Sequence, residues 1–288
     1  MTEPRLRSVP CLDARGLHHM AYWEWGEATR PRVLVCVHGL TRQGRDFDTL
    51  ARDLCAEYRV VCPDVVGRGR SQWLADPQGY AVPQYVADMV TLLARLDVEQ
   101  VDWLGTSMGG LIGLALAALP GAPVRRLVLN DVGPTIEPAA VQRIGAYLGQ
   151  PVRWRTLEEA ADAMWAISQT FGPHTREQWL ALTAPQLLPD GDGFKPRYDP
   201  GIALPLHATT PAAAAAGEAA LWQAYDRITA PTLLLRGAES DLLSRATAQA
   251  MTVRGPKARL HEFPGVGHAP TLVQPEQRAV VRAFLDAP

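Results

Sequence analysis

A serine between two glycines, placed between an apolar run and a run of small residues, constrains this chain more than any other segment. Ser107 is the centre of Gly105-Thr106-Ser107-Met108-Gly109, which follows the mainly apolar residues 101–104 and precedes the small residues 110–115. This order predicts a strand, a sharp turn with serine at its apex, and a helix, with glycines where strand and helix cross closely. The N–H groups at the start of such a helix point at any negative charge that develops nearby. The segment therefore predicts an exposed serine nucleophile.

Composition limits the class of protein. The chain has 288 residues, of which 47% are hydrophobic, which suits one large domain or a domain with a substantial insertion. The net charge is −2 and no basic run stands out, which argues against nucleic acid as a partner. The first residues hold no apolar signal segment, and no stretch approaches the roughly 20 apolar residues of a membrane span. We therefore expect a cytoplasmic protein with no nucleic-acid or membrane partner.

The four cysteines agree with that expectation. Cys11, Cys36, Cys55 and Cys62 form no C-x-x-C pair, so the chain lacks the usual cysteine motifs of metal and redox sites. Cys36 and Cys62 lie in apolar runs, where cysteine packs as a small hydrophobe. We expect free thiols and no metal site.

Short apolar runs alternate with helical patterns in the first part of the chain and again near its end. The predicted strands cover residues 33–37, 59–62, 101–104, 126–130, 231–236 and 259–263, with helical periodicity between them. Strands that alternate with helices predict a mostly parallel sheet covered on both faces. The expected class is α/β.

The alternation stops after Asp131 and resumes only at the strand over 231–236. The residues between show helical stretches and no strongly apolar strand. We therefore expect a core formed by residues 1–133 and 231–288, with a helical insertion over 134–230. Such an insertion would lie over the carboxyl edge of the sheet, where open α/β folds bind ligands.

A serine hydroxyl needs a base to take its proton, and the base needs an acid to orient it. His268 lies in a glycine- and proline-containing loop before the closing helix and is the expected base. Asp241 follows the strand over 231–236 and lies in the loop before the strand that leads to His268, where this arrangement usually places the acid, so it is the preferred acid. Asp131, which ends the strand over 126–130, is the alternative acid, although it could instead cap the segment that follows. Glu239 is a third, less favoured option.

Two backbone N–H groups are expected to stabilise the oxyanion. One belongs to Met108, the residue after the serine, and the other to Leu40, in the loop after the strand over 33–37. His38, in the same loop, is expected to bond nearby backbone and not to act as a base.

Three further side chains are candidates for substrate binding. Arg42 follows the Leu40 loop and could bind a substrate carboxylate with its two-pronged guanidinium, or it could pair with Asp46 or Asp48. Trp165 and Trp179 lie in the expected insertion and could line an apolar acyl pocket, or they could pack the insertion onto the core.

Taken together, these segments resemble the α/β-hydrolase fold, in the subgroup with a helical cap after the sixth strand. The matching segments are His38-Gly39, residues 64–71, residues 105–110, residues 237–241 and Gly267-His268. The resemblance implies an eight-stranded core whose first strand pair runs antiparallel to the rest. It also implies acyl-enzyme chemistry with no metal or organic cofactor. The loop over 64–71 resembles the glycine-rich turn of the family, whose role is mainly structural, so it is not interpreted as a phosphate site.

The resemblance and the serine predict a hydrolase of carboxylic esters, thioesters or lactones of small to medium size, acting through Ser107. Haloalkane dehalogenases and epoxide hydrolases of this fold have aspartate at that position, which argues against those activities here. Two alternatives stay open. One is hydrolysis of a carbon–carbon bond in dienoic keto-acids from ring cleavage, and the other is a ligand receptor with slow or absent turnover.

Overall fold

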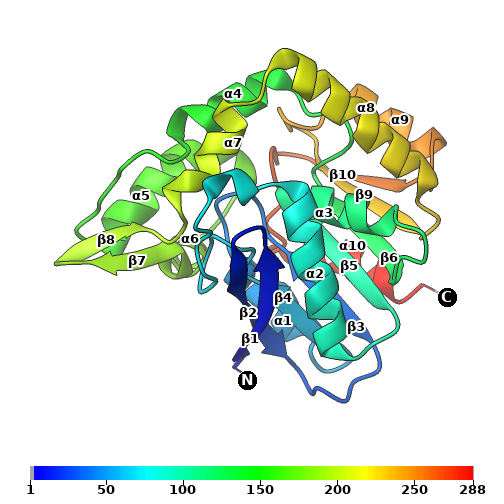
Figure 1. Cartoon of the computed structure of the whole chain (residues 1–288), viewed down its shortest axis with the longest axis horizontal. Helices are drawn as coiled ribbons and strands as arrows, with labels where there is room; N and C mark the ends of the chain where they lie inside the picture. The colour runs from blue at the N-terminus through cyan, green and yellow to red at the C-terminus, as the bar shows by residue number, and fades with distance from the viewer. Residues whose placement is uncertain (1–2, 288) are drawn as a thin grey trace.

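An eight-stranded sheet forms the centre of the molecule (Figure 1). The computed structural model describes residues 3–287. The strands of the sheet are β1 (Arg5–Asp13), β2 (Gly16–Trp25), β3 (Val33–Val37), β4 (Arg59–Pro63), β5 (Val101–Thr106), β6 (Val124–Asn130), β9 (Thr232–Gly237) and β10 (Arg259–Phe263). Their spatial order is β1-β2-β4-β3-β5-β6-β9-β10.

The strand directions confirm a mostly parallel sheet. β1 pairs antiparallel with β2, and β2 pairs antiparallel with β4, whereas β4, β3, β5, β6, β9 and β10 run parallel. Only β2 therefore runs against the others. The expectation that the first pair opposes the rest is wrong for β1, because its antiparallel pairing with β2 returns it to the common direction.

Helices cover both faces of the sheet. The α-helices of the described residues are α1 (Asp48–Leu54), α2 (Val82–Leu96), α3 (Met108–Ala117), α4 (Pro138–Tyr147), α5 (Leu157–Ser168), α6 (Arg176–Thr183), α7 (Ala203–His207), α8 (Pro211–Arg227), α9 (Arg245–Val253) and α10 (Pro275–Leu285). The side chains of β3 show the two layers. Val33, Val35 and Val37 pack with α2 and α3, while Leu34 and Cys36 pack with α1 and α10. A strand buried on both faces must be apolar throughout, which is why β3 shows no alternation in its sequence.

The longest helix that packs directly on the sheet has clear sequence signals. α2 carries a proline in its first turn, where a missing N–H costs nothing. Its buried side chains include Tyr85, Met89, Leu92 and Leu96, at the spacing of one helix face. Asp97 ends the helix in the left-handed conformation, with a φ of 55°.

The segment between β6 and β9 adds no strand to the sheet. It holds α4 to α8 and a short antiparallel ribbon of β7 (Leu187–Asp190) and β8 (Gly193–Pro196), which the sequence did not predict. α4, α5, α6 and the ribbon extend to one side of the sheet, while α8 runs across its top in the view of Figure 1. The last helix, α8, packs on α3 and buries Tyr225 in the core of the sheet.

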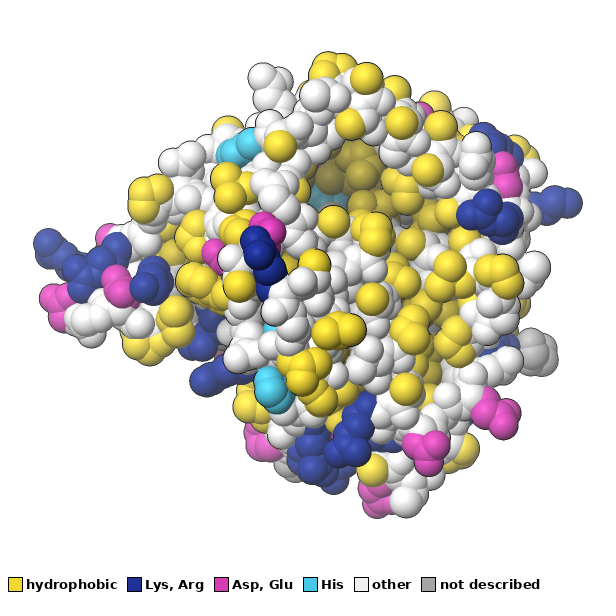
Figure 2. All heavy atoms as spheres, viewed as in Figure 1, with side chains coloured by type: hydrophobic (Ala, Val, Ile, Leu, Met, Phe, Trp, Pro, Cys, Tyr) yellow, Lys and Arg dark blue, Asp and Glu magenta, His cyan; other side chains and the backbone are white. Residues whose placement is uncertain are grey.

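The surface agrees with a molecule of low net charge. Basic and acidic side chains lie intermixed on the face seen in Figure 2, and a hollow with mostly hydrophobic walls opens below α8. Among residues 3–287, no helix is long and apolar enough to span a membrane. Cys11, Cys36 and Cys62 are buried free thiols.

Candidate active site

Ser107 lies at the turn between β5 and α3 in a backbone conformation that few residues other than glycine adopt. Its φ is 52° and its ψ is −116°. A Cβ atom at position 105 would collide with the backbone of Gly109, and one at position 109 would collide with the carbonyl of Val37. Both glycines are therefore needed because β5, α3 and β3 approach closely here. The turn holds the Ser107 hydroxyl at the carboxyl edge of the sheet.

His268 reaches this hydroxyl from the loop between β10 and α10. Its Nε2 lies 3.0 Å from Ser107 Oγ. The loop is also held by the segment between β6 and β9, because the N–H of Gly267 donates to the carbonyl of Thr170. The hydroxyl of Thr170 in turn donates to the carbonyl of His268 at 3.3 Å. The histidine is thus fixed on two sides.

The carboxylate behind His268 belongs to Asp131. Asp131 Oδ2 lies 2.7 Å from His268 Nδ1 and accepts a hydrogen bond from the Ser240 hydroxyl at 2.6 Å. Asp131 Oδ1 accepts the N–H of Gly237 at 2.8 Å. The side chain is fully buried. Three donors therefore hold one buried carboxylate in one orientation, as a base-orienting acid requires.

The structure corrects the preference for Asp241 as this acid. The carboxylate of Asp241 is 42% exposed and pairs with Arg143 of α4, at 2.8 and 3.0 Å. The turn after β9 explains the difference, because the N–H of Ser240 donates to the carbonyl of Gly237 and turns Ser240 towards Asp131. Asp131 follows β6 directly with a φ of 55°, which aims its side chain at the end of β9. The geometry therefore favours Asp131, the alternative acid, over Asp241.

The two residues expected at the oxyanion site lie beside Ser107. Gly109 donates its N–H to the carbonyl of His38 at 3.1 Å, which draws the loop that carries Leu40 against the start of α3. Leu40 lines the same pocket as Ser107. Within the described part of the chain, the N–H groups of Leu40 and Met108 make no hydrogen bond. Unpaired donors at this place are what a developing oxyanion needs.

His38 supports that loop. Its Nδ1 donates to the carbonyl of Gly39 at 2.7 Å, and its Nε2 accepts the N–H of Val65 at 2.9 Å. Complete burial lowers the pKa of His38 to about 3, so the ring is neutral at any ordinary pH. The ring binds backbone on both sides, as the sequence led us to expect.

The serine and the histidine open into a cavity of about 310 Å³. Its walls come from the loop after β3 and from the segment between β6 and β9. Most of the wall is apolar and includes Ile144, Tyr147, Trp154, Met164, Phe171 and Leu182.

Neither Trp165 nor Trp179 is among the residues that line this cavity. Trp179 is 3% exposed and donates its indole N–H to the carbonyl of Ala161 at 2.7 Å. The ring of Trp165 packs edge-on against it, with centroids 5.0 Å apart. The pair joins α5 to α6, so the expected acyl-pocket role is corrected. Met164 faces the cavity instead, because adjacent residues of a helix point about 100° apart.

Arg42 lies in the cavity wall, but its guanidinium already has partners. Its Nε and Nη2 each lie 2.7 Å from the carboxylate of Asp46, and Nη2 lies 3.2 Å from the carbonyl of Leu182. Asp46 also accepts the side-chain amide of Gln186 at 2.8 Å. The structure thus shows the Asp46 pair that the sequence offered as the alternative to substrate binding. Arg143 is the second arginine of the wall.

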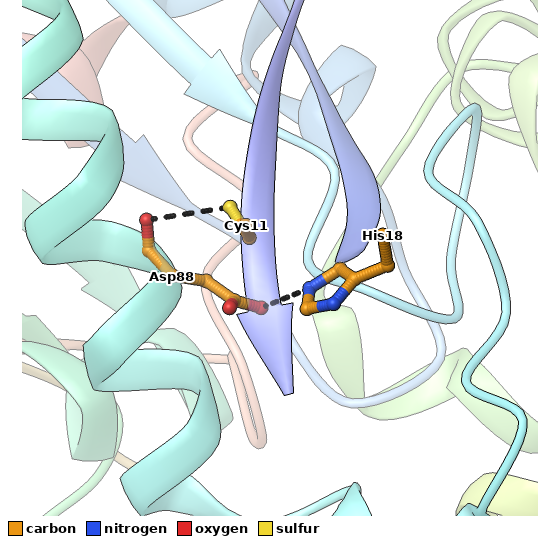
Figure 3. Close-up of side chains that lie close together, drawn as sticks. All are labelled: Cys11, His18 and Asp88. Carbon is orange, nitrogen blue, oxygen red and sulfur yellow. Dashed lines mark hydrogen bonds and ion pairs between the residues drawn. The ribbon is translucent and has the colours of Figure 1, made fainter. Parts of the chain in front are cut away.

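A group of side chains able to bind metal lies away from this cavity (Figure 3). Cys11, His18 and Asp88 are buried, with ligand atoms within 4.8 Å of one another. His18 Nε2 lies 3.1 Å from Asp88, and Nδ1 lies 3.2 Å from Asp13. Burial, with the Asp88 carboxylate, raises the pKa of Cys11 to about 12, so the thiol keeps its proton. The imidazole joins the β1–β2 hairpin to α2, which is a structural role.

Known proteins resemble this chain over nearly its whole length. The model of the alpha/beta hydrolase family matches residues 34–283. The chain is 59% identical to the 3-hydroxybutyrate-oligomer hydrolase of Cupriavidus necator, over 98% of this chain and 97% of that protein. It is 28% identical to a 2-hydroxymuconate semialdehyde hydrolase from a Pseudomonas species, over 75% and 72% of the two chains.

Solved structures agree with these matches. The crystal structure of an alpha/beta hydrolase from Novosphingobium aromaticivorans superposes with a TM-score of 0.86 at 36% identity, covering 99% of both chains. The fold and the family expected from the sequence are confirmed. The protein is a hydrolase and belongs to the alpha/beta hydrolase family.

Proposed function

We propose that this protein is a serine esterase that hydrolyses short oligomers of 3-hydroxybutyrate. The main support is the hydrogen-bonded series Ser107, His268 and Asp131, which faces an apolar cavity. The second support is the 59% identity to a hydrolase named for such oligomers. The oligomers are chains of ordinary carboxylic esters, so the chemistry matches what this series of side chains can do.

In the first step, Ser107 Oγ attacks the carbonyl carbon of the ester while His268 Nε2 takes the hydroxyl proton. Asp131 keeps the proton of His268 on Nδ1 and stabilises the imidazolium, without itself taking the proton. The N–H groups of Leu40 and Met108 bind the oxyanion of the tetrahedral intermediate.

In the second step, His268 gives the proton to the leaving alkoxide, which in an oligomer is the 3-hydroxyl of the neighbouring unit. Water, activated by His268, then attacks the acyl group on Ser107 and releases the acid. No step needs a metal or an organic cofactor.

The cavity supports a short chain as substrate. Its volume of about 310 Å³ lies at the small end of the range for ligand sites, about 300–1,000 Å³. A nucleophile inside a cavity suits a dissolved chain of a few units better than the surface of a solid polymer. The apolar walls suit the methyl and methylene groups of the repeating unit.

We also propose that part of the segment 134–230 serves as a cap over the nucleophile. α4 and α5 supply Ile144, Tyr147 and Met164 to the cavity wall. Because α8 packs on α3, we place the end of the cap before α8, at about residue 209. The core then consists of residues 1–133 with α8 and residues 231–288.

A substrate panel tests the proposed function. The purified protein would be given the dimer and trimer of 3-hydroxybutyrate in both enantiomeric forms, a series of p-nitrophenyl esters, and a dienoic keto-acid from ring cleavage. We expect the largest kcat/KM with the oligomers. A preference for the keto-acid would favour carbon–carbon bond hydrolysis instead, and no turnover of any substrate would favour a receptor.

A further inference from the structure

Arg68 is a fully buried cation in the loop between β4 and α2. Its side chain is 0% exposed, and it is among the largest side chains that are wholly buried. It forms no ion pair with a carboxylate among residues 3–287. Its hydrogen-bond partners are all neutral. Nε donates to the carbonyl of Leu40 at 2.9 Å, and Nη1 donates to the carbonyl of Val66 and the hydroxyl of Tyr85, at 2.8 and 2.9 Å.

A buried positive charge without a counter-ion is costly. Removing a charge from water costs several kcal/mol in a protein unless a partner of opposite charge compensates. A second buried arginine of the chain has such a partner, because Arg59 pairs with Glu24 at 2.8 Å. For Arg68, neutral groups accept from each of its three nitrogens, and the rings of Tyr80 and Tyr85 lie 5.5 and 5.1 Å from its guanidinium carbon. These contacts are weaker than a carboxylate, so most of the charge stays uncompensated.

Arg68 lies next to the proposed oxyanion site. Besides the carbonyl of Leu40, the guanidinium contacts the sulfur of Met108, with Nη2 3.5 Å from Sδ. One side chain thus touches both residues whose N–H groups form the proposed oxyanion site. The tetrahedral intermediate would place its negative charge next to those two residues.

We propose that Arg68 is the positioning residue of the oxyanion site. Its planar guanidinium holds Leu40 and Met108 in place, and its buried positive charge stabilises the oxyanion. The inference rests on the proposed function, since it needs an ester substrate. It assigns Arg68 a part in the chemistry, whereas the loop over 64–71 was expected to be mainly structural. An uncompensated charge acts over a longer range in a buried, low-dielectric site than it would in water.

The surroundings of Arg68 agree with this role. The pKa of His38, in the loop that carries Leu40, is lowered first by burial and then also by the charge of Arg68, so that charge reaches the loop. On its other side the Arg68 loop is braced by the segment between β6 and β9. Arg68 forms a β-bridge with Tyr198, a residue of the cavity wall, and Gly69 donates its N–H to the carbonyl of Arg197 at 3.0 Å.

Steady-state kinetics with p-nitrophenyl butyrate give the first test. Arg68→Met keeps an unbranched chain and removes the charge, and we expect kcat to fall about tenfold or more with KM changed less than about twofold, as for an interaction made only in the transition state. Arg68→Lys keeps the positive charge but not the planar guanidinium, and its kcat should fall less, by about threefold. Arg59→Met, which removes a buried arginine far from the cavity, is the matched control and should keep kcat within about twofold.

A spectroscopic test separates the effect of the Arg68 charge on the oxyanion from a purely structural effect of the substitution. A trifluoromethyl ketone forms a hemiketal with the nucleophile, and NMR follows the ionisation of the hemiketal hydroxyl with pH. We expect that hydroxyl to be about tenfold less acidic in Arg68→Met than in wild type, and little changed in Arg68→Lys. If Arg68→Met does not fold, the kcat of Arg68→Lys decides, and a value equal to wild type would overturn the positioning role.

Unchanged hemiketal acidity in Arg68→Met would also overturn the inference, whatever the loss of kcat, because a purely structural role would then suffice. So would a wild-type kcat in that variant. These results differ from a failure of the proposed function itself, in which the wild-type protein would hydrolyse no ester and form no hemiketal.

Discussion

His268 Nδ1 lies 2.7 Å from Oδ2 of Asp131, a residue 137 positions earlier in the chain. The aspartate stands at the end of β6 and the histidine follows β10, so the two meet only because the parallel strands end at one edge of the sheet. The end of β9 and the loop after it, where the sequence favoured Asp241 as the acid, hold Asp131 through the N–H of Gly237 and the hydroxyl of Ser240.

Two asparagine variants test this relationship. Asp131→Asn should lower kcat by about 10⁴, because the amide would favour the wrong tautomer of His268. Asp241→Asn should keep kcat within about threefold, since Asp241 is exposed and bound to Arg143. Both would be measured with p-nitrophenyl butyrate. The reverse pattern, with Asp241→Asn inactive and Asp131→Asn active, would refute Asp131 as the acid.

Ser240 should affect catalysis only by holding the carboxylate of Asp131 in place. Ser240→Ala removes one of the three donors to the carboxylate, and we expect kcat to fall about three- to tenfold while KM stays near wild type. Ser240→Thr retains the hydroxyl and should recover most of the loss. If the threonine variant is as slow as the alanine variant, the hydroxyl is not the group that matters.

The two arginines of the cavity wall should differ in their effect on a charged substrate. The Arg143–Asp241 pair is about two-fifths exposed, and such pairs are weak, so a substrate carboxylate could displace Asp241. Arg42 is held by Asp46 and is only 15% exposed. We expect Arg143→Gln to raise KM about fivefold for the free-acid dimer of 3-hydroxybutyrate and little for its methyl ester.

The controls for that comparison are Arg42→Gln and Arg176→Gln. Arg42→Gln should affect the acid and the methyl ester alike, because its guanidinium is committed to Asp46. Arg176 pairs with Asp162 outside the cavity, so its variant should change neither KM. Equal KM values for acid and methyl ester in Arg143→Gln, relative to wild type, would exclude carboxylate binding by Arg143.

His38 should make the fold sensitive to acid. Its pKa in the folded protein is about 3, against an ordinary value of 6.5, because of its burial. Between those values the unfolded chain binds a proton that the folded protein does not. The stabilisation is therefore complete above pH 6.5 and is lost as the pH falls, by about 1.4 kcal/mol per pH unit.

Comparison with His38→Gln isolates this effect. Burial raises the pKa of Asp64 to about 6 from 3.8, so Asp64 alone makes stability fall as the pH rises through that range and partly hides His38. Urea unfolding of both proteins would give the difference in the free energy of unfolding at each pH. We expect the difference to shrink from pH 7 to pH 4. A constant difference would contradict a neutral buried His38.

Substitutions of Trp179 and Met164 should have different effects, the first on the stability of the fold and the second on the preferred substrate. Trp179→Phe removes the hydrogen bond to Ala161 and part of the packing between α5 and α6, so we expect about 1–3 kcal/mol less stability and an unchanged order of preference among p-nitrophenyl esters. Met164→Ala enlarges the cavity and should move the preference towards longer acyl chains. A shift of preference in Trp179→Phe instead would mean that the tryptophan contacts substrate.

Much of this site could be predicted from the sequence because its signals are local. The glycines around Ser107 are required by close backbone contacts, and the apolar strand before them and the helix after them are visible in the residues themselves. Leu40 and Met108, the proposed oxyanion donors, are identified from their places next to a strand end and a helix start. These features need only the neighbouring residues to define them.

The errors concern features that depend on three-dimensional packing. Asp131 and Asp241 each follow a strand. Two features of the folded chain make Asp131 the partner of His268: its own left-handed backbone, and the turn that brings Ser240 to it. The one available signal was that Asp131 follows its strand directly. Met164 and Trp165 are adjacent, and periodicity does not say which of them faces a cavity built from other elements.

The most direct test of the catalytic proposal is the release of 3-hydroxybutyrate from its dimer by wild type and by Ser107→Ala at neutral pH. We expect wild type to cleave the dimer rapidly and the alanine variant to be slower by at least about a thousandfold in kcat, the scale of losing a triad member. An alanine variant that keeps a tenth of the wild-type rate would contradict Ser107 as the nucleophile, and a wild-type protein that leaves the dimer intact would contradict the proposed substrate.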